Sequence, residues 1–324
     1  MKQSKNFDLI QENTSNMIDL WMYNFARNIP DFLNGNSVKQ LSVFNNGKKS
    51  IKNHRPSSSA IVVGAGPSVK KNNHLEILSN SNYKGAVVCT DRMLVPCLKN
   101  GITPEKFSKF YVLTIEPKDV TMKYYEDKII QKHKKGISVV LSTCTRHETV
   151  ELCKKNGLKI FWFHPLIDDF RKLGSINKTM NMMSKSEKNP RGLSGMQTGG
   201  NVGSFGWVFS WAILGCSPIS LIGLDLGHPA DTPLENTRHY PEYLRIFKNN
   251  KSQASKYFKK ITNTDLKVKV LSDPIFDFYR EAFLDLVTRT PKWTRTINAT
   301  EGGSLFGKRI ENMKFTDFLT LSKS

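Results

Sequence analysis

The sequence predicts an α/β protein with a Rossmann-like, doubly wound, mostly parallel sheet, an N-terminal helical appendage and a C-terminal helical region. Short apolar runs recur from residue 59 onward, and stretches of helical length separate most of them. These runs are continuously apolar, which is typical of parallel strands covered on both faces. Two glycine-rich turns, at 64–68 and 198–204, stand where a strand or loop meets a helix.

Residues 1–45 are expected to form the helical appendage, packed on the core or on a partner. Apolar residues recur at roughly helical spacing within 7–45, and they include Ile10, Met17, Ile18, Trp21, Met22 and Phe25. Residues 46–58 are polar and rich in turn-forming residues, which predicts a linker. A homo-oligomer formed through the N-terminal helices is left open.

Residues 59–230 are expected to form the sheet-containing core. We expect strands at 60–63, 86–90, 110–115, 138–142, 159–163 and 219–223. We expect helices between them at 70–80, 93–100, 119–134 and 146–155. Residues 170–197 are polar without a clear period, which indicates a long loop or lid over the site.

Residues 231–324 are expected to form a largely helical region that completes the site. The segment 233–290 is expected to be helical. A short strand at 296–298, a Glu-Gly-Gly turn and a final helix near 314–321 are expected to follow it.

The composition is that of a folded protein with a strong positive charge. It is 39% hydrophobic, and 48 Lys and Arg against 28 Asp and Glu give a formal net charge of +20. Such a charge attracts nucleic acid, acidic lipid or phosphate-bearing substrates. No helix-turn-helix, zinc-finger or RNP pattern accompanies it, so we expect no specific nucleic-acid partner. The densest basic stretch, 245–269, is interpreted as a solvent-exposed face or as a surface that attracts phosphate-bearing substrates electrostatically.

Cysteine usage and hydropathy predict a cytoplasmic protein. The five cysteines form no CxxC pair, which is typical of reduced thiols. No apolar signal core follows the first five residues. The longest strongly apolar run, 205–216, is too short to cross a bilayer, so we expect no transmembrane segment.

Residues suited to ligand binding follow the expected strands. In doubly wound sheets, ligands bind beyond the carboxyl ends of the strands, so the sequence predicts one ligand site at that edge. The residues that fall there are 64–68, Asp91, Glu116, 142–145, His164 and Asp225.

The two glycine-rich turns are candidate phosphate cradles. Glycine lets backbone N–H groups approach an anion, and a helix N-terminus adds partial positive charge. The first turn is not a dinucleotide fingerprint, because Val69 stands where a third glycine is needed. A tight turn without a ligand and close helix–sheet packing are the alternatives. The candidate nucleotide-binding residues are Gly64, Ala65, Gly66, Pro67, Ser68, Gly199, Gly200, Asn201 and Gly203.

Three acids at strand ends, Asp91, Glu116 and Asp225, are candidate ligands of Mg²⁺, which neutralises charge on a diphosphate. Asp91 is also a candidate nucleotide-binding residue, and Asp225 a candidate catalytic one. A helix cap or a salt bridge is the alternative role for each acid.

His164 and His239 are candidate catalytic bases or phosphate donors. Arg238, beside His239, is suited to a bidentate phosphate contact. The hydroxyls of Ser142 and Thr143 are candidate donors to a phosphate or a base, with a helix N-cap as the alternative. Structural histidines and a surface role for Arg238 are the other interpretations.

Several segments are informative as a set, in this order along the chain: 61–68, 90–92 with 100–104, 199–203, 222–226 and 298–303. Taken together, they resemble the MptE-like family, which joins archaeal 6-hydroxymethyl-7,8-dihydropterin diphosphokinases to the bacterial Maf motility-associated glycosyltransferases. The Gly-Pro-Ser turn is also similar to that of bacterial sialyltransferases that use a CMP-sugar. The resemblance implies a Rossmann-like transferase core with a nucleotide at the glycine-rich turns. The His- and Asp-rich signature of the small archaeal pterin enzymes is not matched.

Three alternative functions are therefore predicted, in order of preference. The first is transfer of diphosphate from ATP, with Mg²⁺, to a hydroxymethylpterin-like acceptor, mostly by positioning and charge neutralisation. The second is glycosyl transfer from a nucleotide-sugar of the CMP-nonulosonic-acid type to a glycan. The third is binding of a polyanion without catalysis, which predicts affinity that falls steeply with salt.

Overall fold

The computed structural model describes residues 2–44 and 50–322, with side chains from Met17 onward. The expected apolar position Ile10 precedes the first described side chain. Residues 46–49 of the expected linker lie outside the described residues. Among the described residues, no helix has the length and apolar character needed to cross a membrane.

The main sheet follows one path of nine strands in the described chain, and every neighbouring pair is parallel. The short strand β7 (Gly195–Met196) extends β6 beyond that path. In spatial order the nine strands are β1 (Asn36–Ser37), β6 (Lys159–Pro165), β5 (Ser138–Ser142), β4 (Phe110–Thr114), β3 (Ala86–Thr90), β2 (Ala60–Val63), β8 (Ile219–Ile222), β12 (Thr296–Asn298) and β13 (Ile310–Asn312).

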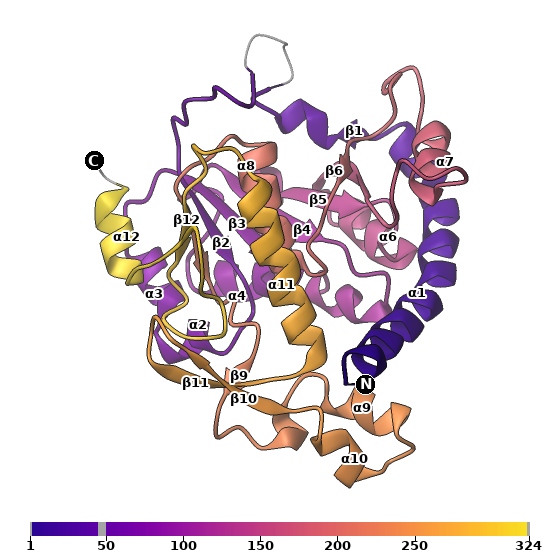
Figure 1. Cartoon of the computed structure of the whole chain (residues 1–324). Helices are drawn as coiled ribbons and strands as arrows, with labels where there is room; N and C mark the ends of the chain where they lie inside the picture. The colour runs from indigo at the N-terminus through magenta and orange to yellow at the C-terminus, as the bar shows by residue number, and fades with distance from the viewer. Residues whose placement is uncertain (1, 45–49, 323–324) are drawn as a thin grey trace.

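The strand order reverses beside β2. From β2 the chain proceeds outward through β3, β4, β5 and β6, and then returns to place β8 and β12 on the other side of β2 (Figure 1). This is the doubly wound arrangement, so the predicted Rossmann-like fold is confirmed. A crevice opens at such a reversal, between β2 and β8, beyond the carboxyl ends of the strands.

Alternate residues of each strand point into two separate hydrophobic clusters. Ile61 and Val63 face one cluster, and Ala60 and Val62 face the other, which also contains Trp207. The second face is covered by α8 (Val202–Ala212) and α11 (Pro274–Arg289). The first face is covered by α1 (Lys2–Leu33), α2 (Ser68–Lys71), α3 (His74–Ser79), α4 (Asp91–Lys99), α5 (Ile129–His133), α6 (His147–Lys155) and α12 (Phe315–Leu321), with the short 3-10 turn η2 (Asp119–Tyr124). A second 3-10 turn, η3 (Lys134–Gly136), follows α5.

The N-terminal helix is shorter than predicted. It ends at Leu33, and the chain then joins the sheet through β1 and a 3-10 turn, η1 (Val38–Leu41). Gly35 lets this exit run against Trp162, because a Cβ there would lie 2.4 Å from the indole. Phe25 and Phe32 are buried, so α1 packs on the core of the same chain.

The segment 170–197 is not a plain loop. It contains α7 (Ile176–Met183), which begins where the Ser175 hydroxyl accepts a hydrogen bond from the Lys178 N–H. The Asp168 carboxylate accepts further hydrogen bonds from the N–H groups of Ile176 and Asn177. Side-chain caps of this kind start a helix where the apolar pattern alone gives no signal.

The expectation of continuous helix over 233–290 is wrong for 259–272. There β10 (Lys259–Asn263) and β11 (Val268–Ser272) form an antiparallel hairpin that continues to β9 (His228–Pro229). Most β10 side chains are exposed, so the hairpin carries no apolar period to distinguish it from a solvated helix. The hairpin lies at one end of the molecule (Figure 1) with η4 (Leu234–Asn236), α9 (Tyr240–Ile246) and α10 (Lys251–Ser255).

Candidate functional site

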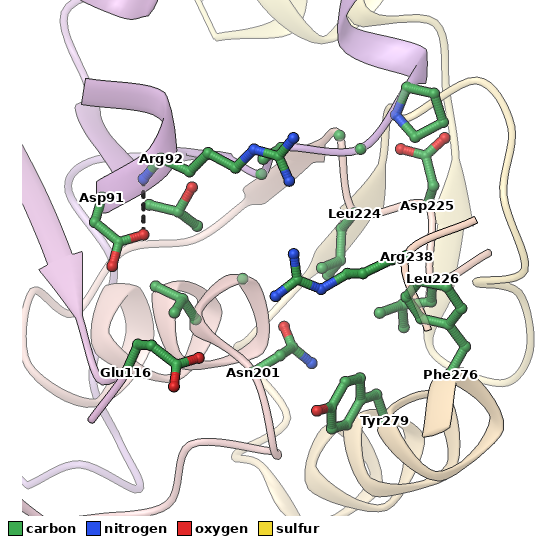
Figure 2. Close-up of a pocket in the computed structure, with 18 of the residues that line it drawn as sticks. Asp91, Arg92, Glu116, Asn201, Leu224, Asp225, Leu226, Arg238, Phe276 and Tyr279 are labelled. Atoms are coloured by element: carbon green, nitrogen blue, oxygen red, sulfur yellow. Dashed lines mark hydrogen bonds between the residues drawn. The ribbon is translucent and has the colours of Figure 1, made fainter. Parts of the chain in front are cut away.

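A pocket of about 700 Å³ lies at the carboxyl ends of β2, β3, β4 and β8, where the strand order reverses. The loops after β2, β3, β4 and β8 form its sheet side, and α8, α11 and the segment before α9 close it (Figure 2). This is the sheet edge at which the sequence predicts a ligand site.

The pocket brings together twelve of the predicted site residues, drawn from six separate segments. They are Gly64, Ala65, Gly66, Pro67, Asp91, Glu116, Gly200, Asn201, Gly203, Asp225, Arg238 and His239. Five others do not line it, namely Ser68, Ser142, Thr143, His164 and Gly199.

The first glycine-rich turn is held by the protein itself. The Gly64 N–H donates to the Ile222 carbonyl at 2.8 Å, and the Gly66 N–H donates to the Gly223 carbonyl at 2.9 Å. A Cβ on Gly66 would lie 1.9 Å from an Asp225 carboxylate oxygen, so glycine is needed for this approach. Of the turn's N–H groups, that of Ala65 has no acceptor among the described residues.

Asp225 occupies the place that the sequence assigns to a phosphate. Its two carboxylate oxygens accept hydrogen bonds from the Ser68 N–H at 3.2 Å and the Ser68 hydroxyl at 2.7 Å. Burial raises the pKa of Asp225 to about 6, although these hydrogen bonds favour the ionised form. An internal carboxylate therefore caps the start of α2.

Asp91 is a buried acid at the first position of α4. One oxygen accepts a hydrogen bond from the Arg92 N–H at 2.7 Å, and the other is buried without a hydrogen-bond partner. Burial raises its pKa to about 7, and the nearby Glu116 charge acts in the same direction. Near neutral pH, Asp91 is therefore divided between the neutral and ionised forms.

The three predicted metal ligands do not fit a shared Mg²⁺ as they lie. Both oxygens of Asp225 are engaged by Ser68, and the partnerless oxygen of Asp91 is enclosed by protein. In the described part of the chain, the His, Cys and acid atoms close enough to share a cation belong to Asp31, His147 and Glu151. These residues lie on α1 and α6, and Lys154 already bridges the two acids. The magnesium assignment stays a prediction that requires Asp91 and Asp225 to change partners.

Two arginines reach into the pocket from opposite sides, Arg92 from α4 and Arg238 from the segment before α9 (Figure 2). Neither guanidinium has a hydrogen bond or ion pair among the residues that the structure describes. Unpaired guanidinium groups facing a cavity are suited to bind phosphate. Arg92 is not among the residues predicted from the sequence, although its place directly after Asp91 at a strand end is a usable signal.

The second glycine-rich turn leads into α8. Gly199 and Gly200 have φ of +62° and +82°, a left-handed conformation that favours glycine. The side-chain amide oxygen of Asn201 accepts a hydrogen bond from the Ser204 N–H at 2.9 Å, so this side chain caps the helix. The N–H groups of Val202 and Gly203 have no acceptor within the described chain, and both residues line the pocket. The start of α8 is thus an open anion-binding position.

His239 lies on the wall formed by the C-terminal region. Its Nδ1 is 2.9 Å from a carboxylate oxygen of Asp273, and its ring packs 4.5 Å from that of Phe276. Phe276 and Tyr279, from α11, add an aromatic surface. Burial raises the pKa of Tyr279 to about 12, so its hydroxyl stays protonated. Sequence reasoning missed these α11 residues, because their pattern is that of an ordinary amphipathic helix.

His164 is buried in β6, outside the pocket, in contact with Phe25 of α1 and Asn177 of α7. Its ring nitrogens lie 3.4 Å from the Thr143 hydroxyl and 3.3 Å from the Asn177 amide oxygen. Burial lowers the pKa of His164 to about 4, so the ring is neutral. The Ser142 hydroxyl accepts a hydrogen bond from the Cys144 N–H. The structure thus does not bring His164, Ser142 and Thr143 to the pocket.

The fold is that of a Rossmann-like α/β protein with a pocket at the strand-order reversal. The model of the family described as "6-hydroxymethylpterin diphosphokinase MptE-like" matches residues 23–231, so the chain belongs to the MptE-like family. No curated protein matches the sequence.

Among solved structures, the fold is similar to that of a Maf glycosyltransferase from Magnetospirillum magneticum AMB-1. The TM-score is 0.54 at 15% identity, over 89% of this chain and 38% of that one. The family match supports a transferase of this superfamily, and the structural neighbour shows the fold.

Proposed function

We propose that the protein is a glycosyltransferase that takes its sugar from a nucleotide-sugar. The observation that carries the proposal is the charge arrangement of the pocket. Two unpaired arginines and the open N-terminus of α8 face the cavity, whereas the Asp225 carboxylate is engaged by Ser68 and Asp91 is partly neutral. Fixed cations and N–H groups, placed in this way, can stabilise a phosphate leaving group directly.

The proposed reaction needs few groups. The acceptor hydroxyl forms a bond to the anomeric carbon, and the bond from that carbon to the nucleotide phosphate breaks. Arg92, Arg238 and the start of α8 hold the departing phosphate. His239 takes the acceptor proton. Phe276 and Tyr279 offer apolar surface to the sugar or base. A donor of the CMP-nonulosonic-acid type has this chemistry, because its leaving group is a single phosphate with a nucleoside.

Diphosphoryl transfer from ATP to a hydroxymethylpterin-like acceptor is the second candidate. The description of the matching family favours it, since that match covers residues 23–231. Aromatic residues at the pocket, Tyr124, Phe276 and Tyr279, are suited to stack on a pterin ring. Mg²⁺ would neutralise the diphosphate charge in that reaction, and Glu116 with Asp91 would hold it once Asp91 turns toward the cavity.

The two candidates differ in products and in metal dependence. The test is to incubate the protein with CMP-, UDP- and GDP-sugars or with ATP, in EDTA or in Mg²⁺, and to measure the nucleotide released. Glycosyl transfer predicts release of the nucleotide from one sugar donor, at a rate that EDTA leaves unchanged. Release of AMP from ATP, only with Mg²⁺ and a pterin alcohol, would replace the first candidate by the second. Turnover of no donor would favour polyanion binding without catalysis.

A further inference from the structure

We infer that Asp273 is a positioning residue that fixes the tautomer and orientation of His239, so that this histidine can act as the base for the acceptor hydroxyl. The inference rests on the proposed function. It concerns a carboxylate that lies outside the segment matched by the family model, at the start of α11.

The two side chains are enclosed together. The His239 side chain is 8% exposed and the Asp273 side chain 1% exposed, and 2.9 Å separates Nδ1 from one carboxylate oxygen. The Phe276 ring packs beside the imidazole at a tilt of 53°, with 4.5 Å between the ring centroids. With one nitrogen held by a carboxylate and an aromatic ring packed beside it, His239 has little freedom to rotate.

Asp273 acts as a hydrogen-bond acceptor in its other contacts. Its second oxygen accepts hydrogen bonds from the N–H groups of Ile275 at 2.9 Å and Phe276 at 3.2 Å, and from the Tyr243 hydroxyl at 3.4 Å. Asp273 is also the N-cap of a 16-residue helix, whose N-terminus favours negative charge. A carboxylate that accepts from these donors is suited to accept from His239 as well, which puts the hydrogen between the two side chains on Nδ1 of His239.

The opposite nitrogen is then a lone-pair acceptor at the pocket. Among the described residues no hydrogen bond reaches Nε2 of His239, and the residue lines the cavity beside Arg238. The charged and titratable groups facing it are Arg238, His228 on β9, Tyr243 on α9 and Asp273. In the step, the acceptor O–H bond breaks, its proton moves to Nε2, and the oxygen forms the glycosidic bond. Asp273 stabilises the imidazolium that results.

The decisive variant is Asp273→Asn, which keeps the size and the helix cap, because asparagine is also a favoured N-cap residue. Its amide oxygen can still accept from Ile275 and Phe276, and its NH₂ then donates to Nδ1 of His239. That hydrogen bond moves the imidazole proton to Nε2 and removes the base. We expect kcat to fall about 100-fold or more with KM for the donor nearly unchanged. Asn250→Ala, which removes the cap of α10 away from the pocket, is the matched control and should keep kcat.

A spectroscopic readout separates positioning from a structural role. In protein with ¹⁵N-labelled histidine rings, the His239 signals, assigned with His239→Gln, should report hydrogen on Nδ1 in the wild type and on Nε2 in Asp273→Asn. Unchanged tautomer and kcat in Asp273→Asn would overturn the inference. If the wild type turns over no donor, the proposed function fails, while the tautomer measurement still decides the role of Asp273.

Discussion

Replacing Asp91 by asparagine should stabilise the protein increasingly as the pH rises. Asp91 is 5% exposed, and one of its oxygens is buried without a hydrogen-bond partner. Burial raises its pKa from the ordinary 3.8 to about 7. Below pH 3.8 the carboxyl is neutral in both folded and unfolded chains. As the pH rises, the unfolded chain loses this proton first, so stability falls until the folded carboxyl ionises as well.

The size of the effect follows from the two pKa values. A difference of about three units at roughly 1.4 kcal/mol per unit predicts a loss of roughly 4 kcal/mol between about pH 4 and about pH 7. The asparagine of the Asp91→Asn variant would keep the acceptor for the Arg92 N–H and carries no charge at either pH. Its NH₂ group adds a cost that is the same at both pH values, so the pH dependence is the diagnostic quantity.

Urea unfolding of the wild type and of Asp91→Asn, at about pH 4 and about pH 7, measures this difference. From about pH 4 to about pH 7, the free energy of unfolding of Asp91→Asn should rise by several kcal/mol relative to that of the wild type. Titrations of other groups, such as Asp225 and His164, occur in both proteins and cancel in the comparison. An equal stability difference at both pH values would refute the assignment of a buried, partly neutral Asp91.

Two further variants test the close approach at Gly66 and the burial of His164. Gly66→Ala places a Cβ 1.9 Å from Asp225 and 2.7 Å from the Gly223 carbonyl, so it should lower the free energy of unfolding by about 1–3 kcal/mol. The matched Gly302→Ala meets no atom within 4 Å and should be nearly neutral in the same thermal or urea experiment. Burial lowers the pKa of His164 from 6.5 to about 4, so this residue alone should cost the wild type roughly 3 kcal/mol of unfolding free energy as the pH falls through that window. The unfolding free energy of His164→Asn should therefore rise relative to that of the wild type by this amount over the same window, and an unchanged difference would contradict the buried neutral histidine.

The sequence predicts the sheet well because its strands are buried on both faces. The expected strands at 60–63, 86–90 and 138–142 coincide with β2, β3 and β5, since a continuous apolar run needs helices above and below it. The hairpin β10–β11 was missed because solvent covers most of β10, and exposed lysines fit a helix or a strand equally well.

The site was predicted in outline and differs in its contacts. Glycine spacing indicates that something approaches the backbone closely at Gly66, but it does not say what. In the structure the approaching group is the protein's own Asp225. Asp273 and Tyr279 lie outside every motif, and only the tertiary fold carries α11 to the pocket. Arg92 was within reach of the sequence argument, because it directly follows a strand-end acid.

The central claim is that unpaired arginines hold a nucleotide phosphate in this pocket. Calorimetric titration with CMP, in EDTA and in Mg²⁺, tests it most directly, with Arg92→Ala, Arg238→Ala and the matched Arg245→Ala outside the pocket. We expect wild type and Arg245→Ala to bind equally with and without metal, and each pocket variant to lose about 10-fold or more in affinity. CMP binding that survives both pocket substitutions, or nucleotide binding that appears only for ATP with Mg²⁺, would contradict the account.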